Sequence, residues 1–499
     1  MNPDSRKEII DFCNSRNQII DKLSIELLEE KENWKEILEN LDEPIISAEK
    51  VREKLTMHTS KLSQMEDKVE IKKTKFAPKA KETDADFYIM DEYEITNKSC
   101  SEGKMDDFQN YFRDKYDFLS SLLSKRAGFS PLSQERFKRA EQYAEVDIVG
   151  MVVKKWVSKK GNKIFELDNF EGKMLVIVSQ DDHKMNMEAD KILIDDVIGI
   201  KGKKFTDEMI IMQSYLRPDL EQRPAKKAKR DLSVMLISDT HVGSKLFLEK
   251  EFKKFISWLN GNSVSESEKD RIGKIKYLVV AGDNVDGIGI YPNQIDELGI
   301  KDIYQQYDKF AECIKEVPEH IEVFICPGQH DAVRRADPQP AIPREYVKEL
   351  YDLKNIHFVG SPSWVEMEGI KCMIYHGASH HDMYAATKHL DVKKPELGMI
   401  ELLKRRDIST GFGQFQPYVP EKKDYMLIRE EPDIYFGGDM HHKGYATYRG
   451  CLAVNAGTWQ EQTDFQIKEG HKPTPGIAID INLKTRQLTE NNFYSKEGL

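Results

Sequence analysis

Acidic and histidine residues recur directly after apolar runs in the second half of the chain. The apolar run 234–237 is followed by Ser-Asp239-Thr-His241, and the run 277–281 is followed by Gly-Asp283. Such runs read as buried strands, and strand ends are where α/β folds build their sites. A single Asp-x-His sequence is weak support for a site, because Asp and His often cap turns. Recurrence at several strand ends is stronger support.

Three further apolar runs end in the same residue types. They lead into Gln329-His330-Asp331, His376-Gly377 and Asp439-Met-His441-His442. Oxygen and imidazole ligands without thiolates suit Mn²⁺, Fe²⁺, Zn²⁺ or Mg²⁺. Two such ions ~3.5–4 Å apart can clamp a phosphate and activate a water. The pattern therefore predicts two-metal hydrolysis of a phosphate ester.

The order of these motifs resembles the calcineurin-like metallophosphoesterases, over the region 231–499. Within it, the stretches 327–341, 402–406 and 420–434 resemble the small subunit of the archaeal family D DNA polymerase. The resemblance implies an α/β calcineurin-like metallophosphoesterase sandwich preceded by an OB-type β-barrel and a small N-terminal helical module. It also implies a metal-dependent 3′–5′ exonuclease that proofreads for a separate large polymerising subunit.

The same resemblance implies roles for the residues at the strand ends. The first metal would be held by Asp239, His241, Asp283 and His441. The second would share Asp283 and be held further by Gln329, His376 and Asp439. His330, held by Asp331, would be the general acid that protonates the leaving 3′ oxygen or steadies the phosphate. The implied cofactor is two divalent ions, with Mn²⁺ preferred over Mg²⁺, Fe²⁺ or Zn²⁺.

Two of the implied ligands depart from the family, and both fall on the second metal. The family carries Asn where Gln329 stands and His where Asp439 stands. Gln329 keeps the carbonyl donor on a stem one methylene longer, and Asp439 offers a charged oxygen in place of an imidazole nitrogen. Both residues keep the capacity to bind a metal, so the site either binds its second metal with altered preference or is partly degraded. A register in which His441 and His442 supply both imidazoles ranks lower, because it breaks the one-residue spacing that puts two side chains on one side of an extended segment.

Basic residues near the motifs are candidates for contact with nucleic acid. Arg334 and Arg335 are the preferred pair, and residues 404–406 are a second group, because the arginine fork suits phosphate oxygens. The competing interpretation is that each of them forms a surface salt bridge. His380 and His381 are interpreted as loop residues outside the site.

Changes in composition divide the chain into five parts. They are a helical module (1–60), a flexible polar linker (61–140) with local helix near 108–123, an OB-fold-like domain (141–218), a basic, proline-containing connector (219–230) and the phosphoesterase domain (231–499). Five short strand-like segments separated by turn residues predict the barrel. Few aromatic residues accompany these strands, so a structural platform and a DNA-binding groove both remain open.

The overall composition limits the location and the partners. The chain has 499 residues and a formal net charge of −11, so any nucleic-acid contact must be local or shared with a partner. Its six cysteines are scattered singly, which predicts neither a disulfide framework nor a zinc finger. No apolar run approaches the ~20 residues of a membrane span, and no signal-type stretch is seen. We expect a cytoplasmic protein without a membrane partner.

These observations favour one function and leave two others open. The favoured one is the small subunit of a two-subunit replicative DNA polymerase, an exonuclease and a scaffold that binds the large catalytic subunit. Its DNA would be a primer–template or a single-stranded 3′ end. The alternative is a non-catalytic accessory subunit with a weakened phosphoesterase site, as the two departures permit. A free-standing phosphoesterase is disfavoured, because it would not need the long N-terminal half.

Overall fold

The chain divides into two compact units, Met1–Phe76 and Ala77–Leu499. A computed structural model of the protein describes residues 3–16, 18–28, 34–39, 45–48, 50–51, 76–262, 264–387, 390–468 and 470–494. Each unit has its own apolar core, and each is described by itself below.

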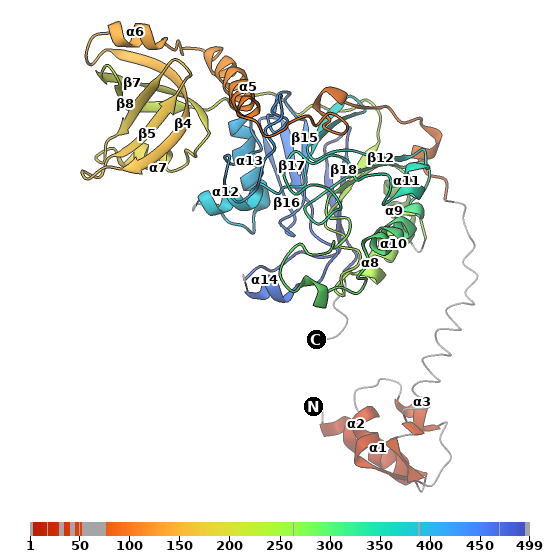
Figure 1. Cartoon of the computed structure of the whole chain (residues 1–499). Helices are drawn as coiled ribbons and strands as arrows, with labels where there is room; N and C mark the ends of the chain where they lie inside the picture. The colour runs from red at the N-terminus through yellow and green to blue at the C-terminus, as the bar shows by residue number, and fades with distance from the viewer. Residues whose placement is uncertain are drawn as a thin grey trace. The chain divides into compact units, whose positions relative to one another are not determined.

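The first unit is a small, mainly helical module (Figure 1). It contains α1 (Pro3–Ser15), α2 (Lys22–Leu28), α3 (Trp34–Glu39) and two short parallel strands, β1 (Ile19–Ile20) and β2 (Ile45–Ile46). Ile9 and Cys13 lie four residues apart, so they share one face of α1, and both are buried. They pack with Ile25, Leu28 and Leu38 from the other helices.

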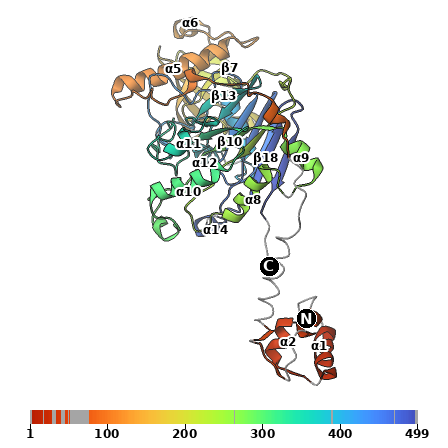
Figure 2. The same cartoon turned by 90° about the vertical axis from the view of Figure 1, so that its right-hand side faces the viewer.

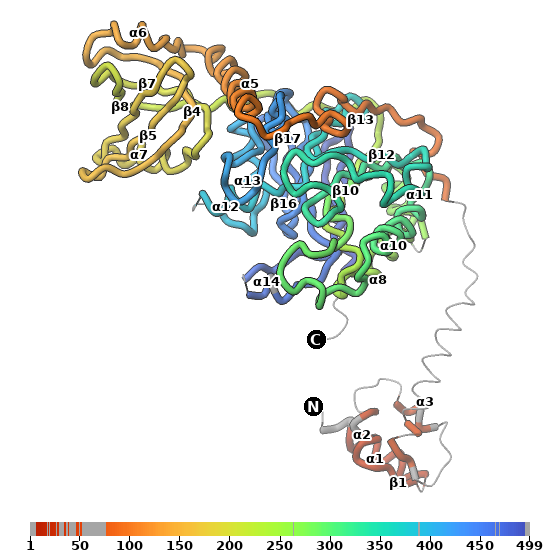
Figure 3. The backbone as a smooth tube through the Cα atoms, in the orientation of Figure 1, coloured from red at the N-terminus to blue at the C-terminus, as the bar shows by residue number. Residues whose placement is uncertain are grey.

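Five strands of the second unit close into a barrel (Figure 3). They are β4 (Glu145–Val157), β5 (Lys163–Asp168), β6 (Lys173–Val178), β7 (Val197–Thr206) and β8 (Met209–Leu216). The order around the barrel is β4-β5-β6-β8-β7, and β4 pairs with β7 to close it. Alternate side chains such as Val176 and Val178 point into its core, as period-two alternation requires. The predicted five-stranded barrel is confirmed.

Two six-stranded mixed sheets form the rest of the second unit. The strands of the first sheet are β9 (Ser233–Ile237), β10 (Ile275–Ala281), β11 (Glu322–Cys326), β12 (Ile356–Phe358), β18 (Ile477–Asn482) and β19 (Leu488–Asn492). Those of the second are β3 (Phe87–Ile89), β13 (Ser363–Met367), β14 (Ile370–Ile374), β15 (Ile434–Gly437), β16 (Gly444–Tyr448) and β17 (Cys451–Asn455). The spatial orders are β12-β11-β10-β9-β18-β19 and β16-β17-β15-β14-β13-β3.

The two sheets pack against each other through one shared apolar core. Val234, Val279 and Phe324 of the first sheet belong to the same buried cluster as Ile374 and Phe436 of the second. Both faces of the central strands are buried, which explains why their sequences read as continuous apolar runs rather than alternating ones. The chain is therefore an α/β protein with mixed sheets.

Helices flank the paired sheets on two sides (Figure 1). Those that follow the barrel in sequence are α8 (Glu249–Leu259), α9 (Glu266–Ile272), α10 (Ile303–Lys315), α11 (Lys348–Tyr351), α12 (His380–Ala386), α13 (Pro395–Arg405) and α14 (Asp464–Lys468). In the turned view of Figure 2, α8 and α9 lie next to β18. On the other side, Met399, Leu402 and Leu403 of α13 pack against Tyr435 of β15.

The described part of the segment expected as a polar linker, 61–140, is folded into the second unit. β3 pairs with β13 at the edge of the second sheet. Helix α5 (Met105–Ser124) buries Leu119 and Leu123, and α6 (Gln134–Arg139) leads into the barrel. The segment differs from the prediction because a three-residue edge strand leaves little periodicity, and because the buried face of α5 includes the charged residue Lys115.

The basic connector 219–230 is also packed rather than free. Leu220 is buried, Arg223 pairs with Asp433 before β15, and Arg230 pairs with Glu368 after β13. The charges of this stretch thus fix it to the second sheet. In the barrel, α7 (His183–Ala189) is capped at its N-terminus by the Asp182 side chain.

Candidate metal centre

The candidate metal centre lies where five strands of the two sheets end. Its residues follow β9, β10 and β11 of the first sheet and β14 and β15 of the second. Within each sheet these strands run parallel, so their carboxyl ends meet at one edge. Five residues there have left-handed backbones, with φ between 46° and 67°: Asp239, His241, Asp283, Asp439 and His441. Such φ values are uncommon outside glycine, and the surrounding structure must hold them.

One group of donors joins the loops after β9 and β15. His241 Nε2 lies 3.0 Å from His441 Nε2. His441 Nε2 lies 3.3 Å from Asp239 Oδ1, and His241 Nε2 lies 3.8 Å from Asp283 Oδ2. Donor atoms of Asp239, His241 and His441 are close enough together to hold one metal ion.

A second group of donors surrounds His376, in the loop after β14. Its Nε2 lies 3.3 Å from Asp283 Oδ2, 3.1 Å from Gln329 Oε1 and 3.6 Å from Asp439 Oδ1. Asp283 Oδ2 therefore contacts both groups. The implied bridging position of Asp283 and the implied second set of donors thus correspond to residues that the fold brings together.

The surroundings of the donor atoms suit a bound divalent cation. Asp239 Oδ1 is buried and accepts no hydrogen bond within the described ranges. A buried carboxylate oxygen without a hydrogen bond is costly, and a cation would remove that cost. Burial raises the pKa of Asp283, but His376 and His330 outweigh this effect and hold it well below its usual range. The carboxylate is thus ionised and ready to bind a metal.

Hydrogen bonds on the far side of each imidazole fix which nitrogen faces the centre. His241 Nδ1 lies 3.0 Å from Asp286 Oδ1, and His376 Nδ1 lies 2.7 Å from the carbonyl oxygen of Ala281. Both Nε2 atoms are therefore left free to bind a metal, as in many protein metal sites. Sequence reasoning assigned no role to Asp286, although it ends the Gly-Asp-x-x-Asp motif.

His330 and Asp331 do not form the pair that was expected. His330 Nδ1 lies 2.7 Å from the backbone oxygen of Asp286, and its Nε2 lies 3.9 Å from Asp283 Oδ2. Asp331 instead accepts hydrogen bonds from Asn284 and from the Tyr307 hydroxyl. The prediction that Asp331 holds His330 is wrong, because the chain turns after β11 and directs the two side chains to different partners.

Two neighbouring histidines on α12 have different surroundings. His381 Nε2 lies 3.1 Å from Asp439 Oδ2, so this imidazole reaches the rim of the centre, although it was expected outside it. His380 is buried and contacts the hydroxyl of Tyr435. The short contacts to Asp239 and His241 come from His441, whereas His442 lines the cavity beside the centre.

The arginines predicted to contact nucleic acid differ in their contacts and exposure. Arg334 donates to the backbone oxygen of Pro338 and to Glu421, so it has a structural role and is not free to contact DNA. Arg405 pairs with Glu401 and Asp196, and it is buried. Arg406 pairs with Glu431 and donates to backbone oxygens. Arg335 is exposed and lines the cavity beside the metal centre.

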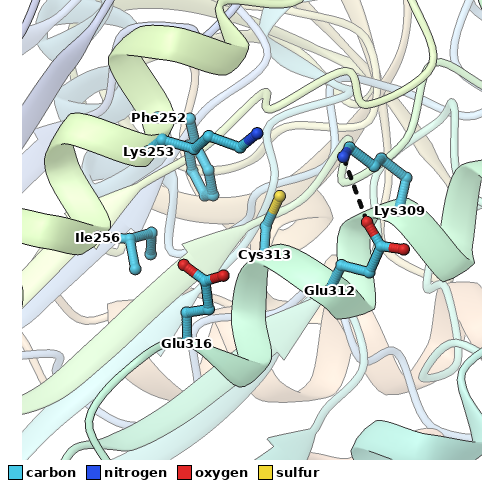
Figure 4. Close-up of a pocket in the computed structure, with 7 residues that line it drawn as sticks. All are labelled: Phe252, Lys253, Ile256, Lys309, Glu312, Cys313 and Glu316. Carbon is cyan, nitrogen blue, oxygen red and sulfur yellow. Dashed lines mark hydrogen bonds and ion pairs between the residues drawn. The ribbon is translucent and has the colours of Figure 1, made fainter. Parts of the chain in front are cut away.

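A cavity of about 410 Å³ opens onto the donor cluster. Its lining includes His241, Asp283, His330 and Asp439, together with apolar residues. A second cavity, of about 120 Å³, lies between α8 and α10 (Figure 4). Its lining includes Cys313, and burial raises the pKa of this thiol to about 11, so it is not poised to react.

Comparison with known proteins identifies the class and then the family. A family model that describes the B subunits of DNA polymerases alpha and epsilon matches residues 234–447, the region of the metal centre. The DNA polymerase II small subunit of Methanothermobacter thermautotrophicus is 36% identical over 488 residues, which cover 95% of this chain and 99% of that protein. The chain therefore belongs to the family of archaeal DNA polymerase II small subunits, the small subunits of family D DNA polymerase.

Two further relatives carry the same name at similar identity. The protein of Methanocaldococcus jannaschii is 37% identical over 405 residues, which cover 81% of this chain and 68% of that protein. The protein of Archaeoglobus fulgidus is 38% identical over 388 residues, which cover 77% of each chain. None of the helices in the described ranges is both long and apolar enough to cross a membrane.

Proposed function

We propose that this chain is the small subunit of a two-subunit DNA polymerase and that its metal centre removes nucleotides from the 3′ end of DNA. One observation carries the proposal: donor atoms from five strand ends converge around Asp283, which contacts both groups. The relatives' shared name supports the subunit assignment. A large polymerising subunit is then the expected partner.

The finer fold assignment belongs to the same proposal. Two mixed sheets packed face to face, with helices on both sides and donors at the strand ends, fit a calcineurin-like metallophosphoesterase domain. The barrel order, which reads first-second-third-fifth-fourth along the chain, fits an OB fold. The location expected for such a subunit is the cytoplasm.

The centre would hold two divalent ions, with Mn²⁺ preferred, in the two donor groups described above. When bound, such ions supply an activated water and neutralise charge on the phosphate. The protein's own contribution is positional. Asp286 and Ala281 orient two imidazoles, and His330 presents Nε2 to the cavity, where it can donate a proton to a phosphate or leaving oxygen.

The alternative is an accessory subunit that keeps the fold but hydrolyses poorly. Gln329 and Asp439 favour it, because each replaces the ligand implied by the family resemblance. Against it, both side chains still lie within 3.6 Å of His376 Nε2. The two donors thus keep contact with the second group.

The proposal is tested by a nuclease assay on the purified full chain, alone and with its large subunit. The substrate is a primer–template with a 3′ mismatch, and Mn²⁺ is supplied. His330→Ala should lower the rate by ~10²–10⁴-fold if His330 transfers a proton. His357→Ala is the matched control, because its side chain is equally exposed at 18% and also near a carboxylate, but it lies outside the centre.

The outcomes separate the two functions. Hydrolysis that needs His330 but not His357 supports the exonuclease. No hydrolysis by the wild type, with or without the large subunit, leaves the accessory role. In that case Gln329→Asn with Asp439→His tests whether the two departures caused the loss. Co-purification with a much larger polymerase chain tests the subunit assignment independently.

A further inference from the structure

Phe415 is an apolar side chain that the fold leaves in solvent. Its exposed fraction is 85%, higher than that of any other large apolar side chain in the described ranges. Phe412, three residues earlier, packs against Phe108, Tyr111 and Phe112 at ring-centroid distances of 5.4 to 5.7 Å. One phenylalanine of this loop therefore stabilises the fold, and the other does not.

The loop that carries Phe415 is fixed on both sides of it. The Asp382 carboxylate accepts the backbone N–H of Gln416 at 2.8 Å and lies 3.5 Å from the Thr410 hydroxyl. Gln416 Nε2 also donates to Asp337 Oδ2 at 3.0 Å. These bonds fix the backbone next to Phe415, which itself lines the cavity beside the donor cluster.

Phe415 lines the same cavity as the donor cluster. The apolar and aromatic residues of the lining also include Ile290, Tyr291, Met440 and Pro473. The cavity of about 410 Å³ lies in the ~300–1,000 Å³ range of small-molecule sites, which suits a single nucleotide. A lining that holds both apolar and charged residues matches a nucleotide, which joins a flat base to a phosphate.

We propose that the cavity binds one unstacked nucleobase, which stacks on Phe415 while its phosphate lies at the donor cluster. This inference rests on the proposed nuclease function. Every base presents a flat face, so the site would take any of the four bases. Arg335, exposed on the same cavity, is placed to contact the backbone of the bound strand.

Such a site would favour the binding of mismatched 3′ ends. A base enters it only after leaving its neighbour in the stack, and that costs least for a mispaired or single-stranded base. Stacking on Phe415 offsets part of the free energy of unstacking. A correctly paired 3′ nucleotide would therefore enter the cavity less often than a mispaired one, without any reading of the base sequence.

The test is a two-by-two binding cycle on the full chain with Mn²⁺. The protein is wild type or Phe415→Ala, and the 3′-terminal nucleotide of a fluorescent single strand carries its base or is abasic. A phosphorothioate at the last linkage slows hydrolysis, so anisotropy reports binding. Removal of the base should weaken binding to the wild type by about 5- to 140-fold, the range for one stacked base. It should have no effect on binding to Phe415→Ala.

Further variants and outcomes make the result decisive. Phe415→Trp keeps a ring and should behave like wild type, and Tyr88→Ala, an exposed aromatic residue of β3, is the matched control. An equal loss on base removal in wild type and Phe415→Ala overturns the inference, as does no binding by the wild type. The nuclease assay is read separately: absence of hydrolysis with an intact cycle would refute the proposed function but not the base site.

Discussion

Asp286 offers a direct test of how the candidate metal centre is held together. Its buried carboxylate receives His241 Nδ1 at 3.0 Å and Gln460 Nε2 at 3.1 Å on Oδ1. Gln294 Nε2 lies 3.4 Å from Oδ2. Burial raises the pKa of Asp286, but the hydrogen bond and charge of His241, the charge of His330 and the contact with Gln294 together outweigh this and lower the pKa overall. The carboxylate is therefore charged, and it orients the His241 imidazole with Nε2 towards the centre.

Two substitutions remove different parts of this support. Asp286→Asn keeps an acceptor for His241 but loses the charge and turns a donor towards Gln294. Asp286→Ala removes the acceptor as well and leaves His241 Nδ1–H buried without a partner. Loss of such a supporting contact typically weakens metal binding ~10–100-fold, or about 1.4–2.8 kcal/mol. We expect the loss of metal affinity to lie near the lower end of this range for Asp286→Asn and near the upper end for Asp286→Ala.

The measurement is Mn²⁺ titration of the metal-free full chain by isothermal titration calorimetry. Asp296→Asn, an exposed carboxylate of the short 3₁₀ helix 294–296, is the control for loss of one negative charge. Affinities that match wild type in both Asp286 variants would refute the reasoning. So would a loss of the same size in Asp296→Asn, because the effect would then be general electrostatics.

Three other predictions concern stability. Lys115→Met should lower the hydrogen-exchange protection of α5 by roughly 100-fold or more. Lys115 Nζ lies 2.7 Å from Asp407 Oδ2, the lysine side chain is 1% exposed, and breaking a buried ion pair costs ~3–5 kcal/mol. Adding Asp407→Asn should recover part of the protection. Mn²⁺ at 100 times its Kd should stabilise the metal-free chain by ~2.7 kcal/mol for each site that it fills, as measured by calorimetry, and EDTA should reverse this. Burial lowers the pKa of His320 to about 4. As the pH falls from ~6.5 towards 4, this imidazole is protonated in the unfolded chain but not in the folded one, so the folded protein loses stability. His320→Gln should flatten that part of the pH–stability curve.

The strands and their ends could be predicted because their signal is local. Buried parallel strands need continuous apolar runs, and the residues directly after them lie at one edge of the sheet. This was enough to place Asp239, Asp283 and His376 near one another. The barrel was equally accessible, because strands such as β5 (Lys163–Asp168) are bounded by turn residues.

The directions of individual side chains could not be predicted in the same way. Asp331 and His330 are neighbours in sequence, but their orientation depends on a turn whose partners come from elsewhere: Asn284 from the loop after β10, and Tyr307 from α10. The role of α5 was hidden for a similar reason. Lys115 bonds to Ser409, which is 294 residues away, and a lysine gives no hint of burial until its partner is known.

Contacts between the barrel and the two-sheet region favour a platform role for the barrel. Asp195 and Asp196 lie in the loop before β7. Asp196 Oδ1 lies 3.1 Å from Arg405 Nε of α13, and Asp195 Oδ2 accepts the backbone N–H of Phe412 at 2.6 Å. Phe412 belongs to the loop that carries Phe415, so the barrel contacts this loop through a backbone hydrogen bond and helix α13 through an ion pair. This supporting role does not require the barrel itself to bind DNA. Loosening Asp195 should therefore act on the cavity in the way that Phe415→Ala does, although the residue lies in the barrel.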